Sequence, residues 1–512
     1  MTLVAGVDSS TQSCKVVIRE AGSGRFVRAG SAPHPDGTEL DPEHWWTALR
    51  TAADRAGGLG DVAAISVAGQ QHGMICLDSD GDVIRPALLW NDTRSAQAAR
   101  DLVTDLGGGD PAAGAAAWAG AVGSVPVASF TVAKLRWLAD HEPDAAVRIA
   151  AIALPHDWLT WRLAGARSLD TLRTDRSDAS GTGYYDASAG TADVPDGATG
   201  TSGRAADAFG GHPAPAGGYR RDLLALALRR TPGETARIRL PEVAAPGEAV
   251  GRGDPGAGLG HLLLGPGCGD NAGAALGLGL RPGACLLSLG TSGVVAAVSR
   301  VGTRDASGAV AGFADATGHH LPLACTLNAS RVLDVTRRLL EVDHDTLDTL
   351  ALRAEPGAGG LVFVPYLEGE RTPNLPTATG SLHGLSLAST TRENLARASV
   401  EGLLCLMAEC VDVMRAQNVD VGRVTMVGGG ARSRAVRALA PAVLGVPVAI
   451  PSPGEYVADG AARQAAAVLL AGQPDWPAVD AATHTAPPCP EIREKYRAAA
   501  ALAAEDATAS AV

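Results

Sequence analysis

The sequence predicts an α/β protein made of two related domains, because two features of its first half return in its second half. The first feature is a β-hairpin with a short hydroxyl-rich turn, at residues 3–18 and again at 286–298. The second is an apolar strand that runs into a glycine-rich tip, at residues 63–73 and again at 424–432. A chain of 512 residues is long enough for two or more domains with substantial cores. These matching places favour duplicated domains that hold one ligand together.

The two hairpin turns, residues 8–13 and 290–293, are suited to phosphate. Each brings several backbone N–H groups and small hydroxyls to one point, and such groups bind phosphate oxygens. One turn of this kind is weak evidence. Two turns in matching halves indicate a polyphosphate ligand.

The two strand tips differ in chemistry. Ligands of open α/β sheets bind at the ends of strands. The first tip carries Gln70, Gln71 and His72, which suits a polyol, although a lone histidine is more often structural. The second tip, residues 428–432, is nearly bare backbone and suits a flat nucleoside.

The elements in chain order define three parts. Residues 1–280 alternate strands and helices, with helices expected at 42–53, after Asp41 as N-cap, and at 132–140. Residues 186–218 contain too little apolar surface to order themselves, which predicts a mobile surface insertion. A second domain is expected over 281–475. A tail over 476–512 ends in an Ala-rich helix.

Composition excludes several classes of protein. The net charge is −12, and no cluster of Lys or Arg indicates a nucleic-acid partner. Asp8 interrupts the first apolar stretch, and no apolar run is long enough for a membrane span, so we expect no signal peptide and a cytoplasmic protein. The eight cysteines include no Cys-x-x-Cys pair, which favours buried free thiols.

The lysines exclude the two commonest ATP sites. Lys15, Lys134 and Lys495 are the only lysines, and none lies in a G-x-x-x-x-G-K-[ST] loop or a V-A-I-K strand. The remaining common solution is a pair of hairpins on two related domains, as in the actin-like and sugar-kinase superfamily, with the phosphates in the cleft between them.

Two aspartates are candidates for the chemistry. Asp270 begins a predicted helix within a glycine-rich run, where it is either an N-cap or a general base that accepts a proton from a substrate hydroxyl. Asp8 ends a strand beside the first turn. It either stabilises that turn or holds Mg²⁺ through water, since this ion keeps much of its hydration shell.

Nine motifs in order resemble one family, the FGGY carbohydrate kinases. They are VDSSTQSCKV, AGQQHG, LLWNDTR, SFTVAKLRWLADH, TDRSDASGT, GCGDNAGAA, LSLGTSGV, PYLEGERTP and VGGGARS. The resemblance covers most of the chain except residues 186–218 and the tail.

The resemblance implies two RNase H-like domains of the actin type with a catalytic cleft, the first binding sugar and the second ATP. It implies phosphorylation of D-xylulose by Mg·ATP in xylose catabolism. Asp270 corresponds to the general base and Asp8 to the carboxylate near the metal, and the residues that correspond to sugar contacts are Gln71, His72, Asp270 and Asn271. The implied ATP contacts are Thr11, Ser13, Lys15, Gly290, Thr291, Ser292, Asn328, Gly429, Gly430, Ala431 and Arg434.

Two alternatives remain open. The chain could be another FGGY kinase, for ribulose, gluconate or glycerol. It could also be a catalytically silent, nucleotide-dependent sugar sensor, since a fold does not fix an activity. The resemblance is also compatible with a homodimer.

Overall fold

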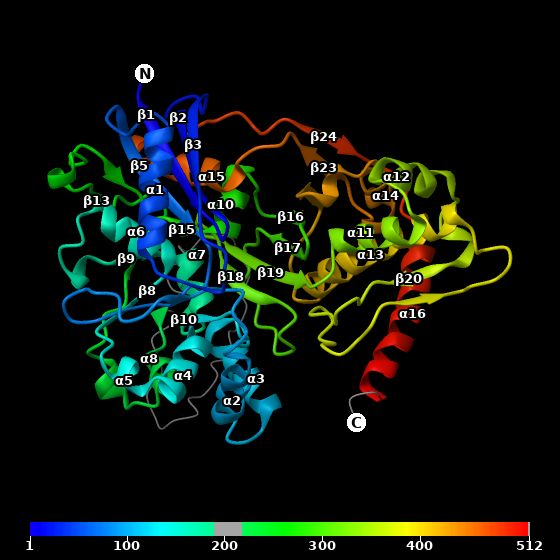
Figure 1. Cartoon of the computed structure of the whole chain (residues 1–512), viewed down its shortest axis with the longest axis horizontal. Helices are drawn as coiled ribbons and strands as arrows, with labels where there is room; N and C mark the ends of the chain where they lie inside the picture. The colour runs from blue at the N-terminus through cyan, green and yellow to red at the C-terminus, as the bar shows by residue number, and fades with distance from the viewer. Residues whose placement is uncertain (189–217, 510–512) are drawn as a thin grey trace, which may run out of the picture. The chain divides into compact units, whose positions relative to one another are not determined.

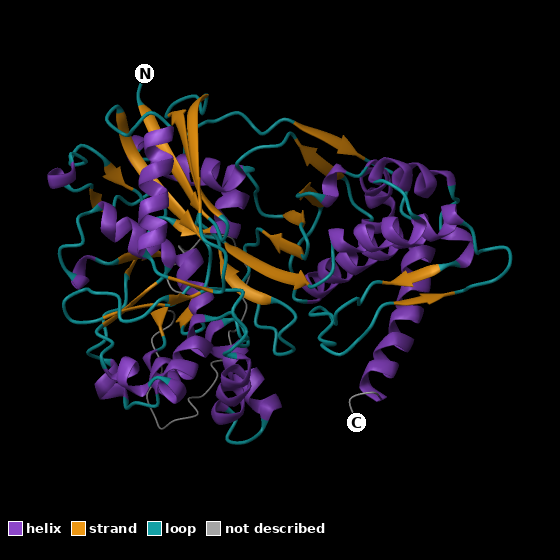
Figure 2. Ribbon diagram, viewed as in Figure 1, coloured by secondary structure: helices purple, strands orange, loops and turns teal. Residues whose placement is uncertain are grey.

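The computed structural model describes residues 1–188 and 218–509, so the predicted insertion at 186–218 lies almost wholly outside the described residues. The chain forms two compact units. Unit 1 comprises Met1–Gly279, Gly302–Leu321 and Gly454–Ala478, and unit 2 comprises Leu280–Val301, Pro322–Pro453 and Val479–Val512. Figure 1 identifies the elements along the chain, and Figure 2 colours the same view by secondary structure.

Unit 1 is built on a mixed sheet with the order β13-β14-β5-β1-β2-β3, to which β15 adds by pairing with β5. The predicted first hairpin is confirmed, because β1 and β2 pair antiparallel from Leu3↔Glu20 to Ser9↔Cys14. The strands are β1 (Leu3–Ser9), β2 (Ser13–Glu20), β3 (Phe26–Pro33), β5 (Val62–Gly69), β13 (Gly251–Arg252), β14 (Leu263–Leu264) and β15 (Cys268–Gly269).

Helices cover both faces of this sheet, with α1 (Glu43–Arg55) and α6 (Pro155–Leu163) on one face and α10 (Asp270–Gly277) and α15 (Tyr456–Leu470) on the other. The remaining helices of the unit are α2 (Ala96–Leu106), α3 (Pro111–Val122), α4 (Thr131–His141), α5 (Pro143–Val147), α7 (Arg176–Ala179), α8 (Arg221–Leu228) and α9 (Pro232–Thr235), most of which pack on one another rather than on the sheet. Small two-stranded sheets complete the unit, namely β4 (Glu39–Leu40) with β7 (Ala87–Leu88), β6 (Ile75–Leu77) with β8 (Ala151–Ala153), β9 (Arg173–Asp175) with β12 (Glu242–Ala244), and β10 (Tyr185–Asp186) with β11 (Gly218–Tyr219).

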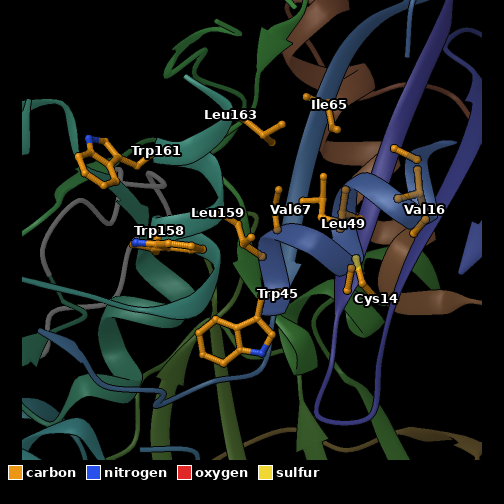
Figure 3. Close-up of a cluster of buried hydrophobic side chains, with 14 of the residues drawn as sticks. Cys14, Val16, Trp45, Leu49, Ile65, Val67, Trp158, Leu159, Trp161 and Leu163 are labelled. Atoms are coloured by element: carbon orange, nitrogen blue, oxygen red, sulfur yellow. The ribbon is translucent and has the colours of Figure 1, made fainter. Parts of the chain in front are cut away.

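Side chains of β1 alternate between two cores, as the period of two along a strand requires. Leu3, Ala5 and Val7 pack in a large cluster with residues of α1 and α6 (Figure 3). Val4, on the opposite face, packs with Ala465 and Ala466 of α15. This strand is therefore buried on both sides, which explains why it is apolar almost throughout.

The helix α15 packs on unit 1, which the sequence analysis did not foresee when it assigned residues 281–475 to one domain. Its approach is close enough that a Cβ on Gly6 of β1 would lie 1.9 Å from the backbone oxygen of Ala458. The Ala-rich face of α15 therefore fits where β1 lacks a side chain.

The second sheet has the order β18-β19-β17-β16-β22-β23-β24. The second predicted hairpin is confirmed, because β16 and β17 pair antiparallel on either side of residues 290–292. The strands of this sheet are β16 (Ala284–Leu289), β17 (Gly293–Ala297), β18 (Ala311–Ala314), β19 (His320–Thr326), β22 (Arg423–Val427), β23 (Val448–Pro451) and β24 (Ala481–His484). β20 (Val362–Val364) and β21 (Ser381–His383) form a separate pair.

The helices of unit 2 are α11 (Ser330–Leu340), α12 (His344–Arg353), α13 (Arg392–Ala416), α14 (Arg434–Leu444) and α16 (Pro490–Ala509). Along α13 most side chains are buried, because the helix packs against β17, β20 and the neighbouring helices α11, α12 and α14. The predicted Ala-rich helix of the tail is confirmed as α16.

The predicted helices of unit 1 are confirmed with small shifts at their ends. The first begins at Glu43 with Pro42 at the N-cap position, so the assignment of Asp41 as N-cap is wrong by one residue. Asp41 lies just before the cap, and its Oδ1 accepts the Glu43 N–H at 3.0 Å. All eight cysteines are free thiols, as predicted, and six of them are buried. Among the described residues no helix is long and apolar enough to cross a membrane.

Candidate active site

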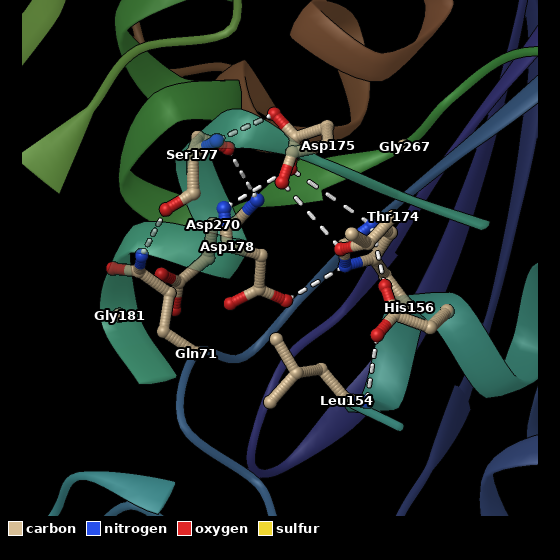
Figure 4. Close-up of polar contacts among 12 residues, drawn as sticks. Gln71, Leu154, His156, Thr174, Asp175, Ser177, Asp178, Gly181, Gly267 and Asp270 are labelled. Atoms are coloured by element: carbon tan, nitrogen blue, oxygen red, sulfur yellow. Dashed lines mark hydrogen bonds and ion pairs between the residues drawn. The ribbon is translucent and has the colours of Figure 1, made fainter. Parts of the chain in front are cut away.

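Two neighbouring strand ends of unit 1 bring the predicted sugar contacts together. β15 pairs parallel with β5, with Cys268 opposite Ala68 and Gly269 opposite Gly69. The residues that follow each strand therefore meet. Asn271 Nδ2 donates to Gln71 Oε1 at 3.1 Å, and Gln71 Nε2 donates to the carbonyl of Ser177 at 3.3 Å (Figure 4).

Asp270 is the first residue of α10, and Gly269 occupies the N-cap position. The N-cap interpretation of Asp270 is therefore wrong. Its carboxylate accepts hydrogen bonds from the Asn271 backbone N–H at 2.7 Å and from Asn271 Nδ2 at 2.9 Å. Burial, and then the negative charge of Asp8, raise the pKa of Asp270 to about 7. A carboxylate with a pKa near neutrality is suited to accept a proton.

Asp8 lies inside β1 rather than in the turn, and it is 6% exposed. Its Oδ1 has no hydrogen-bond partner among the described residues. Burial raises its pKa to about 7, opposed by the charge of Lys15 and assisted by that of Glu455. A buried carboxylate oxygen without a partner is costly, which indicates a binding role.

His72 is held in a fixed orientation. Its backbone has a φ of 68°, which is unusual for a residue with a side chain. Its Nδ1 lies 2.6 Å from the carbonyl of Gly181, and its ring stacks on Phe130 with centroids 4.8 Å apart. Its own carbonyl accepts Lys134 Nζ at 2.8 Å. The orientation of the imidazole is therefore fixed both by the contacts of its ring and by the hydrogen bond to the backbone carbonyl of the same residue.

The predicted phosphate contacts of the first hairpin have partners within unit 1. Thr11 Oγ1 accepts from Trp90 Nε1 at 2.8 Å, and Ser13 begins β2. Lys15 pairs with Glu455 at 2.6 Å. That ion pair is partly exposed, so a phosphate could compete for the lysine.

In unit 2 the second turn and the second strand tip are neighbours. β16 and β22 pair parallel up to Ser288↔Val427, so the turn of Gly290, Thr291 and Ser292 lies beside the tip of β22. Gly428, at the start of that tip, has a φ of 93°, and a Cβ there would lie 2.7 Å from the Leu289 oxygen. Gly429, Gly430 and Ala431 follow in a short 3₁₀ segment and its cap.

Two other predicted ATP contacts of unit 2 are engaged in structural bonds. Arg434 Nη2 donates to the Asp345 carbonyl and to Thr349 Oγ1, each at 3.2 Å, which ties α14 to α12. Asn328 is buried and donates to the Gly369 carbonyl and to Glu370. Its Oδ1 has no hydrogen-bond partner among the described residues.

The sequence favoured residues 175–178 as part of the pocket without assigning their contacts, and it gave Lys134 no role. Ser177 Oγ accepts the Gly269 N–H at 3.0 Å, and its carbonyl accepts Gln71. Lys134 is fully buried and supports His72. The signals that could have singled out Lys134 were the scarcity of lysine and its place in the motif SFTVAKLRWLADH.

Two mixed α/β sheet domains with this pair of hairpin turns define a kinase of the actin and hexokinase-like fold. The family models for the N-terminal and C-terminal domains of the FGGY family of carbohydrate kinases match residues 3–193 and 285–469. The chain belongs to the FGGY family of carbohydrate kinases, enzymes that transfer phosphate from ATP to a sugar.

Similar proteins carry a more specific description. A xylulose kinase from Streptomyces coelicolor is 43% identical over 91% of this chain and 88% of its own length. A xylulose kinase from Streptomyces rubiginosus is 41% identical over 92% of this chain and 89% of its own. The crystal structure of a xylulose kinase from Bifidobacterium adolescentis superposes with a TM-score of 0.88 at 48% identity, covering 97% of this chain and 99% of that one.

Proposed function

We propose that this enzyme phosphorylates the terminal hydroxyl of D-xylulose with ATP, giving D-xylulose 5-phosphate and ADP. The observation that carries the proposal is the 48% identity to a xylulose kinase over 97% of the chain. The polar cluster of the buried Gln71 and His72 and the half-buried Asn271 supports it, because amides and an imidazole discriminate among sugars by their hydroxyls.

Asp270 is the general base of the proposed reaction. It accepts the proton of the sugar hydroxyl as that oxygen attacks the γ-phosphorus of ATP. The bond between the γ-phosphorus and the bridging oxygen breaks, and ADP leaves with the electron pair. The protein takes little part in the covalent chemistry of phosphoryl transfer, so positioning of the substrates and a proton acceptor account for most of its contribution to the rate.

Asp8 would hold Mg²⁺ through water. Its unpartnered Oδ1 suits this, and no group of three or more metal-ligating side chains occurs in the described parts of the chain. An ion that keeps its waters and takes ligands from nucleotide phosphates needs few from the protein. When bound, Mg²⁺ neutralises charge on the phosphates.

The nucleotide site is proposed to use the backbone of Gly290–Ser292 for phosphate and that of Gly429–Ala431 for the nucleoside. Both stretches follow neighbouring strand ends of one sheet, the place where ligands of open α/β sheets bind. Thr11, Ser13 and Lys15 are proposed as further phosphate contacts. Arg434 and Asn328 are weaker candidates, since their side chains already hold neighbouring elements.

The test is release of ADP across D-xylulose, D-ribulose, D-gluconate and glycerol at matched concentrations. D-xylulose should give the highest kcat/KM. Higher activity with another acceptor would replace the proposed substrate while keeping the kinase. Binding of sugar and ATP without turnover of any acceptor would favour the silent sensor instead.

A further inference from the structure

We infer that His156 is a positioning residue of the acceptor site, a buried hub that fixes the three chain segments carrying Gln71, Ser177 and Asp270. This inference rests on the proposed function for the roles of Gln71 and Asp270. His156 is the second residue of α6, its side chain is fully buried, and it belongs to none of the motifs predicted to bind substrate.

Two segments of the site pack closely against His156. A Cβ on Gly267, three residues before Asp270, would lie 2.2 Å from His156 Cδ2, so this glycine leaves the space that the imidazole fills. A Cβ on Gly69, which ends β5 just before Gln70 and Gln71, would lie 3.0 Å from the backbone nitrogen of His156 and 3.1 Å from its Cβ. The segment before Asp270 is therefore set against the ring, and the segment before Gln71 against the start of the helix that carries it.

The third segment is held by a hydrogen bond. His156 Nδ1 lies 2.7 Å from Asp178 Oδ2 in α7, and Figure 4 shows that carboxylate turned toward the ring. The preceding residue, Ser177, accepts the N–H of Gly269 and the amide of Gln71. The hydrogen bonds that run from His156 through Asp178 and Ser177 of α7 therefore reach the ends of both β5 and β15.

Acidic groups face the ring from α6 itself, from the end of β9 and from α7. Asp157 Oδ1 lies 3.1 Å from Nε2, and Asp175 Oδ1 lies 3.9 Å from it. Burial disfavours a charge on His156, but Asp157 and then Asp178 outweigh burial and raise its pKa to about 9. The carboxylates therefore favour the protonated ring, whose Nδ1 is hydrogen-bonded to Asp178 and whose Nε2 makes an ion-pair contact with Asp157. Buried ion clusters of this kind contribute little net stability, and they restrict the geometry of the groups that they join.

Three substitutions separate positioning from stability. His156→Leu keeps volume and removes both donors. His156→Asn restores a donor near the Nδ1 position, facing Asp178. His261→Leu is the control, because His261 is a histidine of the same unit whose Nε2 lies 3.1 Å from the Leu59 carbonyl, before the start of β5, whereas the site follows the end of that strand.

We expect His156→Leu to lower kcat/KM for the acceptor by about 10²-fold, the usual loss for a displacement near 1 Å. His156→Asn should recover at least ten-fold of that loss. ATP affinity by calorimetry should match that of the wild type in both variants, and His261→Leu should leave acceptor kcat/KM unchanged.

Three results would overturn the inference: unchanged acceptor kinetics in folded His156→Leu, an equal loss of ATP affinity, or no recovery in His156→Asn. If His156→Leu does not fold, Asp178→Asn takes its place under the same criteria. The wild-type acceptor panel is measured in parallel. If D-xylulose fails there, the proposed substrate is wrong, and the variants are judged with the acceptor that the wild type prefers.

Discussion

The site contains two carboxylates, the buried Asp8 and the half-buried Asp270, whose surroundings suit the different roles proposed for them. Asp270 is bonded to the N–H groups of Asn271, whereas Asp8 keeps an oxygen without a partner. A carboxylate oriented by fixed donors is suited to a directional proton transfer. One with an open oxygen is suited to a hydrated cation. The difference between the two roles comes from hydrogen bonds, since burial raises both pKa values to about 7.

Asp270→Asn tests the proposed base. The amide oxygen can still accept the Asn271 N–H, so the start of α10 should survive. A positioned base contributes about 10²–10⁴ in rate, so single-turnover phosphorylation of the acceptor should slow by that factor. ATP binding by calorimetry should be retained. Asp54→Asn, on the exposed face of α1, is the control and should turn over normally. Near-normal turnover of Asp270→Asn would remove Asp270 from the mechanism.

At the scale of elements, Asp270 is placed by the packing of α10 against α15. The two helices approach closely through glycines: a Cβ on Gly460 would lie 1.9 Å from the Gly273 oxygen, and one on Gly277 would lie 1.9 Å from the Tyr456 oxygen. The atoms in the way are backbone, which cannot rotate aside. Any side chain at these positions must move a whole helix.

Gly460→Ala should therefore lower the free energy of unfolding by about 1–3 kcal/mol, the usual cost of overpacking. It should also lower kcat, since α10 carries Asp270. Gly472→Ala is the matched control, because nothing lies within 4 Å of its Cβ position. Denaturant unfolding of both variants measures the difference. Equal stability of the two variants would show that the contact between α10 and α15 accommodates an added methyl group without cost.

Secondary-structure elements were predictable where the sequence pattern that defines them is local. The apolar alternation of 3–18 and 286–298, with turn residues between, was enough for both hairpins. Contacts between distant residues were not predictable. Lys15 pairs with a glutamate 440 positions away, and His156 bonds to Asp178 22 positions away. The membership of α15 in unit 1 likewise depends on a glycine in β1 that a one-dimensional pattern cannot relate to it.

At the scale of the whole molecule, buried charge makes stability depend on pH. Burial lowers the pKa of Lys134 from 10.5 to about 7. Between these values the unfolded chain binds more protons than the folded one, so this lysine makes stability rise with pH from about 7 to about 10. Below about pH 7 the full cost of the buried charge is present.

Lys134→Met removes this dependence along with two hydrogen bonds to carbonyls. The unfolding free energy of the wild type minus that of the variant should therefore increase from pH 7 to pH 10. Urea unfolding at three pH values measures it. Lys495→Met, at an exposed lysine of α16, should show no such trend. A flat or falling difference for Lys134→Met would contradict the assignment.

The buried free thiols allow the opening of each unit to be measured separately. Cys14 and Cys76 lie in unit 1 and Cys405 and Cys410 in unit 2, and burial raises the pKa of each thiol. An alkylating reagent needs both access and a thiolate, so each thiol reacts only when the structure around it opens. Labelling followed by peptide mass spectrometry thus measures the rate at which each unit opens, without an engineered probe. A sugar or a nucleotide added alone will slow the labelling of the thiols in the unit that binds it.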